Sequence, residues 1–140
     1  MQRATAAKIT RFNSGALILI ALLWAAAPYG PIDAPARIML DILAWPYGDG
    51  TPVWEPNIKW LSSISAGLLL MLGIILLGVI APALQAGDKR VAWITLLAMC
   101  GWFVIDSAGS IASGFGSNAV FNIGLLVPIC IPLLAIMRED

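Results

Sequence analysis

Four long apolar segments constrain the fold more than any other feature of the sequence. They cover about residues 5–27, 57–84, 91–113 and 118–137. A helix needs roughly 20 mostly apolar residues to cross the hydrocarbon of a bilayer, and each segment reaches that length. Of the 140 residues, 60% are hydrophobic and 11% are charged, whereas soluble domains are about 25% charged. The sequence therefore predicts an all-α integral membrane four-helix bundle, with residues 1–140 forming a single transmembrane domain.

The start of the chain allows two interpretations. Arg3, Lys8 and Arg11 precede the first apolar segment, which is also the order of a cleaved signal peptide. We expect instead a first spanning helix that ends at about Ala27, because Pro28 cannot continue the helical hydrogen bonding.

The linker between the first two spans contains a short helical pattern over about residues 34–44. Asp33 is placed to cap this helix, and Arg37 and Asp41 share its polar side. The apolar side holds Ile38, Met39, Ile42 and Leu43. A helix of this length is too short to span, so we expect an amphipathic helix in the first outer loop, on the membrane surface or across the end of the bundle.

Aromatic residues gather around the same loop. Trp and Tyr are enriched where a membrane protein crosses the interface between lipid and water. The expected interfacial anchors are Trp45, Tyr47, Trp54 and Trp60.

The basic residues predict the orientation. With four spans, both termini and the link at residues 85–90 lie on one side, together with six of the eight basic residues. The opposite side holds only Arg37 and Lys59. Because cytoplasmic loops carry an excess of Lys and Arg, we expect both termini in the cytoplasm.

One carboxyl group and several small polar residues lie within the last two spans. Asp106, Ser110 and Ser113 follow i, i+4, i+7 spacing and share a helix face, and Asn118 and Asn122 lie one turn apart in the next span. A hairpin centred on about residue 116 would bring Ser110 level with Asn122 and Ser113 near Asn118, with Asp106 a turn deeper. These five residues are the expected contacts to a ligand or partner.

Two interpretations of this polar group remain open. Small and hydroxyl-bearing residues also let membrane helices pack closely and bond to one another, and Asn118 also fits as the N-cap of the last span. A charged side chain in the hydrocarbon costs roughly 2.5–3.5 kcal/mol even on the lenient insertion scale, so an intramembrane acid is a functional candidate. Asp106 is therefore either a functional group or a carboxyl bonded to Asn122, Ser110 or a partner subunit.

Several classes of function find no support in the sequence. The chain has no histidine and no Walker loop, CxxC pair or cluster of metal-ligand residues, so we expect no metal and no cofactor. Asp106 has no second acid within the spans, so acid–base catalysis lacks a partner. We therefore name no catalytic residue and do not expect an enzyme. The formal net charge of +0 gives no reason to expect nucleic acid as a partner.

The order of polar residues between Trp102 and Leu134 is distinctive. An aromatic-rich helix leads to D-S-x-x-S, a small-residue turn and N-x-x-x-N, which are here Asp106, Ser107, Ser110, Asn118 and Asn122. In this pattern, and in the Pro-x-x-x-Trp lead from Pro56 to Trp60, the chain resembles a group of short bacterial four-helix integral membrane proteins of unknown function. The resemblance implies the four-span topology and singles out Asp106, but it implies no activity.

Three functions are compatible with these observations. We expect a structural or accessory subunit of the cell inner membrane that assembles, within the lipid bilayer, with itself or with a larger membrane protein complex through its polar outer-leaflet face. The alternative is a small transporter or channel subunit in which Asp106 binds a proton or a cation. A further alternative is a lipid-binding or lipid-modifying protein, which an acyl-chain groove leading to Asn122 would favour.

Overall fold

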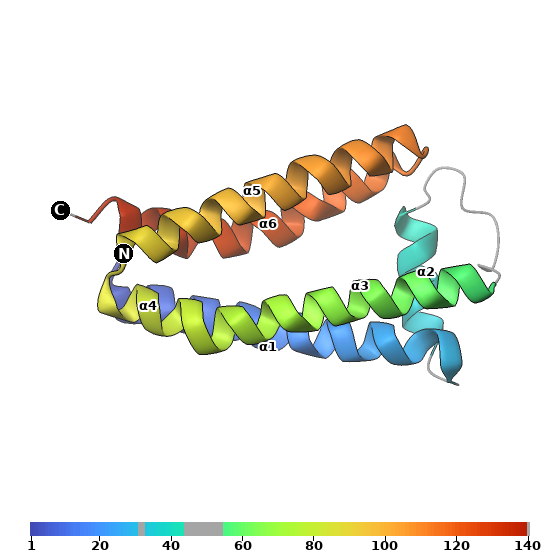
Figure 1. Cartoon of the computed structure of the whole chain (residues 1–140), viewed down its shortest axis with the longest axis horizontal. Coiled ribbons are helices and arrows are strands. Elements are labelled where there is room, and N and C mark those ends of the chain that lie inside the picture. Colours follow the sequence, from blue (N-terminus) through green and yellow to red (C-terminus); the bar gives the residue numbers. More distant parts are fainter. Residues whose placement is uncertain (31–32, 44–54, 140) are drawn as a thin grey trace.

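The computed structural model describes residues 1–30, 33–43 and 55–139, and every regular element in this part of the chain is a helix. Four helical segments are long and apolar enough to cross a membrane: Arg3–Tyr29, Pro56–Ala86, Lys89–Ala112 and Gly116–Met137. A short helix lies in the loop after the first of them (Figure 1). The predicted all-α fold with four apolar spans and a short helix in the first loop is confirmed.

The first helical hairpin pairs α1 (Arg3–Ala26) with α3 (Pro56–Ile75). Small residues allow the two backbones to approach closely: a Cβ atom added at Gly73 would lie 2.7 Å from Ile18 Cγ1 and 3.3 Å from the backbone oxygen of Ser14. The buried residues of α1 are mostly small, and they include Ala6, Ala7, Thr10, Ser14 and Ala21. Close approach through small residues is the usual way that membrane helices gain packing contacts.

The second span is not a uniform α-helix. After α3 the chain passes through a π turn (Leu76–Ile80) and continues as α4 (Ala81–Ala86), which has Pro82 in its first turn. Proline has no N–H, and its ring clashes with the carbonyl four residues earlier. The preceding turn therefore widens into the π turn.

The second hairpin begins after a tight turn. Gly87 takes a left-handed conformation with φ +78°, which favours glycine, and the Asp88 carboxylate accepts a hydrogen bond of 3.0 Å from the Val91 backbone N–H. This capping bond starts α5 (Lys89–Ala112), which packs along α6 (Gly116–Met137). The chain reverses at Gly114, where φ is +86°.

Helix α6 corrects one prediction. Its N-cap is Phe115, so Asn118 lies inside the first turn and is not the N-cap. The side chain of Asn118 is consequently available for contacts across the hairpin.

The prolines within α6 show how a membrane helix replaces a lost hydrogen bond. Pro132 has no N–H to donate to the carbonyl of Pro128, four residues earlier. The Asn13 side chain of α1 donates to that carbonyl instead, with 2.8 Å between Nδ2 and O. Neighbouring helices commonly satisfy the carbonyls that interior prolines free in membrane helices.

The short helix α2 (Ala34–Leu43) crosses the end of the bundle opposite the termini (Figure 1). Met39, Leu40 and Leu43 face the space between the hairpins, and the Ser117 hydroxyl of α6 donates to the carbonyl of Leu43. Ile38 and Ile42 are exposed, at 61% and 59%. The apolar residues of α2 thus divide between an inward and an outward side.

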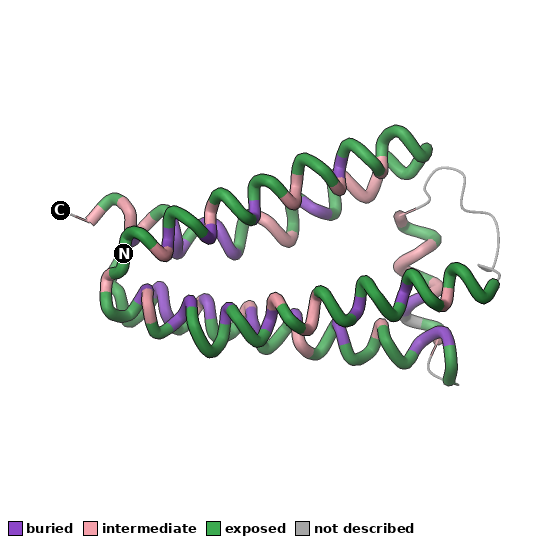
Figure 2. The backbone as a smooth tube through the Cα atoms, viewed as in Figure 1, coloured by how far each residue is buried: buried purple, intermediate pink, exposed green. Residues whose placement is uncertain are grey.

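The termini and the α4–α5 link lie together at the other end (Figure 1). Arg3 Nε lies 2.6 Å from Glu139 Oε2, and Arg11 Nη2 donates to Gln85 Oε1 at 2.7 Å. Leu84, Leu133 and Ile136 are fully buried near this end. Figure 2 shows buried residues along the inner sides of the hairpins and exposed residues along their outer sides, and many of the exposed side chains are large and apolar, as a lipid-facing surface requires.

Candidate functional site

A cavity of about 910 Å³ lies between the two hairpins at the α2 end. All five of the neighbouring helices contribute to its walls, through residues that include Leu17, Trp24, Leu40, Leu61, Trp102 and Phe121. A second cavity of about 560 Å³ shares the wall residues Trp102 and Asp106 and extends along Leu72, Met99 and Ile129 towards the middle of the helices. The two cavities therefore form an apolar space with a shared polar position at Asp106.

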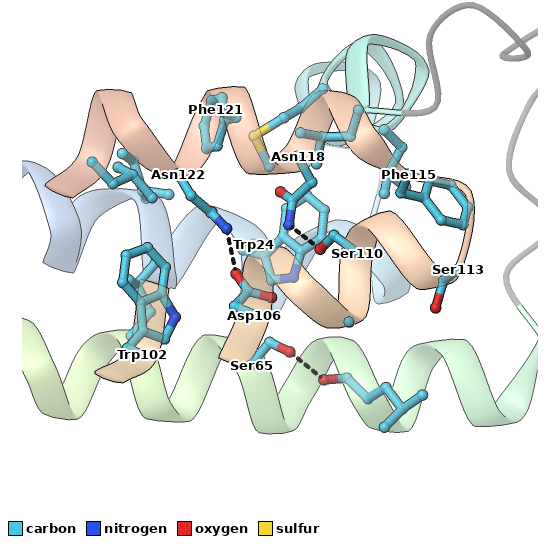
Figure 3. A pocket seen from close by; sticks show the side chains of 18 of the residues that line it. Trp24, Ser65, Trp102, Asp106, Ser110, Ser113, Phe115, Asn118, Phe121 and Asn122 are labelled. Atoms are coloured by element: carbon cyan, nitrogen blue, oxygen red, sulfur yellow. Dashed lines mark hydrogen bonds between the residues drawn. The ribbon is translucent and has the colours of Figure 1, made fainter. Parts of the chain in front are cut away.

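Asp106 is held by a buried asparagine from the facing helix. The Asn122 Nδ2 atom of α6 donates to Asp106 Oδ2 at 2.8 Å, and Asn122 is only 2% exposed (Figure 3). The same Nδ2 lies 3.3 Å from the hydroxyl of buried Ser107. Within the described part of the chain, neither Asp106 Oδ1 nor Asn122 Oδ1 receives a hydrogen bond. The pair therefore keeps two acceptor oxygens for a further donor.

A second polar contact lies closer to the turn. Asn118 Nδ2 donates to the Ser110 hydroxyl at 2.8 Å (Figure 3). Ser113 lines the cavity but is exposed at the end of α5. The five expected site residues thus share one cavity wall, with Ser113 at its rim.

The hairpin register differs from the predicted one. Asp106 pairs with Asn122, and Ser110 pairs with Asn118, so both pairs are centred on residue 114. The expectation that Ser110 lies level with Asn122, with Asp106 a turn deeper, is wrong. The shift arises because the chain reverses at Gly114 and α6 begins at Gly116.

Several wall residues were not expected from the sequence. Trp102 lies four residues before Asp106 on α5, so helical spacing alone would have placed it on the same face. Ser107, the second residue of the D-S-x-x-S pattern, is buried next to Asp106 and accepts from Asn122 Nδ2 at 3.3 Å. Trp24 of α1 and Ser65 of α3 line the same cavity. The position of Ser65 in the outer half of its span places it in the same leaflet as Asp106, but no pattern in the sequence relates Trp24 to Asp106.

The predicted interfacial anchors lie mostly outside the described residues. Trp45, Tyr47 and Trp54 fall between residues 44 and 54, which the structure does not describe. Trp60 lies near the start of α3 and is 63% exposed. Its role as an anchor stays a prediction.

The site offers the chemistry of binding. Residues 1–30, 33–43 and 55–139 contain no group of three or more His, Cys, Asp or Glu side chains able to hold a metal. The walls supply carboxylate and amide oxygens, a hydroxyl and aromatic faces around an apolar space. Such a set suits a molecule with one polar end and one apolar end.

No protein-family model, no curated protein and no solved structure matches the chain. The interpretation of the site therefore rests on its geometry and chemistry.

Proposed function

We propose that this chain is a multi-pass membrane protein that binds an amphiphile from the bilayer in the cavity between its two hairpins. The observation that carries the proposal is an apolar cavity with the Asp106–Asn122 pair on its wall. The polar end of the amphiphile would contact this pair, and its hydrocarbon chain would lie against the apolar walls. This is the lipid-binding alternative raised by the sequence.

The size and lining of the cavity support this function. Cavities that bind small molecules are typically about 300–1,000 Å³, mostly apolar, with a few polar groups that orient the ligand. The cavity of about 910 Å³ fits this description, and the adjoining space along Leu72, Met99 and Ile129 is apolar. An alkyl chain would replace lipid contacts with protein contacts there.

The packing of the helices leaves a way in from the side. The main contact between the hairpins is α1 against α6, with smaller contacts around α4 and the π turn, and no comparable packing joins α3 to α5 in the described residues. Figure 1 shows the hairpins diverging towards the α2 end. A molecule already dissolved in the bilayer would enter between α3 and α5 without crossing water.

A specific observation also favours assembly with another membrane subunit. Ile105, on the cavity wall, is 77% exposed, and the neighbouring Val104 is 63% exposed. A helix of a partner subunit placed between α3 and α5 would cover Ile105. Isolation of the native assembly in a gentle detergent tests this candidate, because a partner seated on Ile105 would be recovered by crosslinking from that position.

Filling the cavity tests the binding function. A Cβ atom added at Gly109 or at Gly101 of α5 meets no atom within 4 Å, but only Gly109 lines the cavity. We expect Gly109→Phe to weaken the binding of monomyristoylglycerol by about tenfold or more, since the ring occupies the space of the alkyl chain. Gly101→Phe is the matched control and should bind as the unmodified protein does.

Native mass spectrometry of the protein in a maltoside detergent measures this binding. The proposal predicts one saturable ligand per chain for the unmodified protein and for Gly101→Phe. Equal binding by Gly109→Phe, or no saturable binding by any of the three proteins, would contradict it.

The location is a further part of the proposal. We place the protein in the cell inner membrane of a bacterium, as the resemblance of its last two spans implies. We place both termini in the cytoplasm because six of the eight basic residues belong to the terminal side. Cysteines introduced at Ser113 and at Arg90, in a chain with Cys100 and Cys130 replaced by alanine, would report the two sides. An impermeant maleimide applied to whole cells should label Ser113→Cys and spare Arg90→Cys, and the reverse result would invert the topology.

A further inference from the structure

The chemistry around Asp106 also indicates the class of the ligand. Resting on the proposed function, we infer that the amphiphile is a single-chain amine without a phosphate, whose primary ammonium group binds Asp106. Three independent features of the cavity wall carry this inference: its charge, its free acceptors and its aromatic faces.

The ionisable group that the described residues place on the cavity wall is an acid. Of the described residues that line the two cavities, Asp106 alone bears a carboxyl or a basic group. Residues 31–32, 44–54 and 140, which the structure does not describe, include no Lys or Arg. A carboxylate removed from water is stabilised when an opposite charge pairs with it. The ligand is the available source of that charge.

The basic side chains at this end of the bundle are engaged elsewhere. Arg37 of α2 pairs with Asp33, the residue that precedes this helix, and Lys59 Nζ lies 5.6 Å from the centroid of the Tyr29 ring. Asp41 and Glu55 add further negative charge at the same end. An anionic head group would therefore meet repulsion, and a phosphate close to the amine would find no basic partner on the wall.

The hydrogen bonds of the Asp106–Asn122 pair favour a ligand that donates hydrogen bonds. Asn122 uses its amide N–H groups on Asp106 Oδ2 and on Ser107, at 2.8 and 3.3 Å. What remains in the described residues is Asp106 Oδ1 and Asn122 Oδ1, and both are acceptors. A primary ammonium has three N–H donors and no acceptor, so it complements both oxygens. Charge-assisted bonds of this kind are stronger than neutral ones.

Aromatic residues complete the site. Trp24, Trp102 and Phe121 line the cavity that contains Asp106 (Figure 3). The faces of aromatic rings attract cations, and Trp does so most strongly. The alkyl chain of an amine would continue into the apolar space along Leu72 and Met99.

The test compares four amphiphiles with the same alkyl chain length. These are tetradecylammonium, monomyristoylglycerol, tetradecanoate and the lysophosphatidylethanolamine with a myristoyl chain. Each is titrated against the protein in a maltoside detergent and counted by native mass spectrometry. We expect tetradecylammonium to bind about tenfold or more tightly than each of the other three.

Two variants distinguish the effect of the Asp106 charge from that of the overall negative charge at the α2 end of the bundle. Asp106→Asn keeps the shape of the side chain and removes its charge, so it should reduce ammonium binding by about tenfold or more and leave glycerol binding within about threefold. Glu55→Gln removes an exposed carboxylate at the same end, where Glu55 makes no side-chain capping bond. This control should bind the ammonium as the unmodified protein does.

The possible outcomes separate this inference from the proposed function. Saturable binding of all four amphiphiles with similar affinity, unaffected by Asp106→Asn, would overturn the ammonium assignment and leave amphiphile binding intact. Equal binding of tetradecylammonium and the lysophospholipid would overturn the exclusion of a phosphate from the head group. No saturable binding of any probe would overturn both. Selective binding of tetradecylammonium that is lost in Asp106→Asn supports both.

Discussion

The two ends of the bundle are built from the same four spans but differ in packing. At the terminal end, Leu84, Leu133 and Ile136 are fully buried, and Arg3 pairs with Glu139. At the α2 end the hairpins diverge around a cavity of about 910 Å³ (Figure 1). The closed end holds the hairpins together, whereas the open end presents polar and aromatic side chains.

The difference follows from the residues that face inward. Towards the terminal end the inward positions include Ala6, Ala81 and Ala92, each 0% exposed, which let the helices meet. Towards the α2 end, Trp24, Trp102 and Phe121 face the space between the hairpins. Sites that exchange ligands are usually drawn from the less stable parts of a fold. Stability and binding are therefore separated along the length of this molecule, and substitutions should affect them separately.

The largest loss of stability should come from a substitution within the close α1–α3 contact. Gly73→Leu would place its Cβ atom 2.7 Å from Ile18 and 3.3 Å from the backbone of Ser14. Overpacking of this kind costs about 1–3 kcal/mol or more. Thermal unfolding in detergent, followed by circular dichroism, should show a clearly lowered midpoint.

Gly67→Leu is the matched control for that substitution. Gly67 lies on the same helix, and an added Cβ meets no atom within 4 Å. Its unfolding midpoint should stay near that of the unmodified protein. Equal midpoints for the Gly73 and Gly67 variants would mean that the close α1–α3 contact does not hold the first hairpin together.

A smaller loss of stability is expected when the hydrogen bond from Asn13 of α1 to the Pro128 carbonyl of α6 is removed. Asn13→Ala leaves the Pro128 carbonyl without its donor, which lies at 2.8 Å. Hydrogen bonds between membrane helices contribute about 1 kcal/mol, so Asn13→Ala should lower the free energy of unfolding by that amount. Equilibrium unfolding in mixed micelles provides the measurement.

A double-mutant cycle shows whether the proline is the reason for this bond. Pro132→Ala restores a backbone N–H that can donate to Pro128 within α6. In that background, Asn13→Ala should cost much less than in the unmodified chain. The same cost in both backgrounds would show that Asn13 stabilises the protein by another contact.

Most of the fold was predictable from the sequence because the physical constraint is strong. A bilayer requires long apolar helices, and four apolar segments of that length with few charges have few ways to fold other than as membrane-spanning helices. The short helix at Ala34–Leu43 was predictable from the helical spacing of its apolar and charged residues. The periodicity did not show that Met39, Leu40 and Leu43 would face the space between the hairpins while Ile38 and Ile42 face outward. That division depends on where the hairpins end.

The site was predictable only in part. The cost of an intramembrane acid singles out Asp106, and helical spacing relates it to Ser110. Its pairing with Asn122 depends on the residue at which the chain reverses, and a shift from residue 116 to Gly114 exchanged the partners. Trp24 and Ser65 reach the cavity from the other hairpin. Local sequence patterns carry no information on how far apart two hairpins lie, so the cavity could not be predicted from the sequence.

The smallest effect should come from the ion pair at the terminal end. The Arg3 side chain is half exposed, and Glu139 Oε2 lies 2.6 Å from its Nε atom. Exposed pairs contribute about 0–1 kcal/mol and are screened by salt. Arg3→Gln should therefore lower the unfolding midpoint slightly at low salt, and the difference should disappear at about 1 M salt, where the Debye length is about 3 Å.

Lys8→Gln is the control, as an exposed basic residue on the same helix. A loss that persists at high salt would instead point to the contact of Arg3 with the Ala86 carbonyl, at 3.5 Å. If the loss is small and screened, the closed end is held by packing around Leu84 and Ile136 rather than by charge.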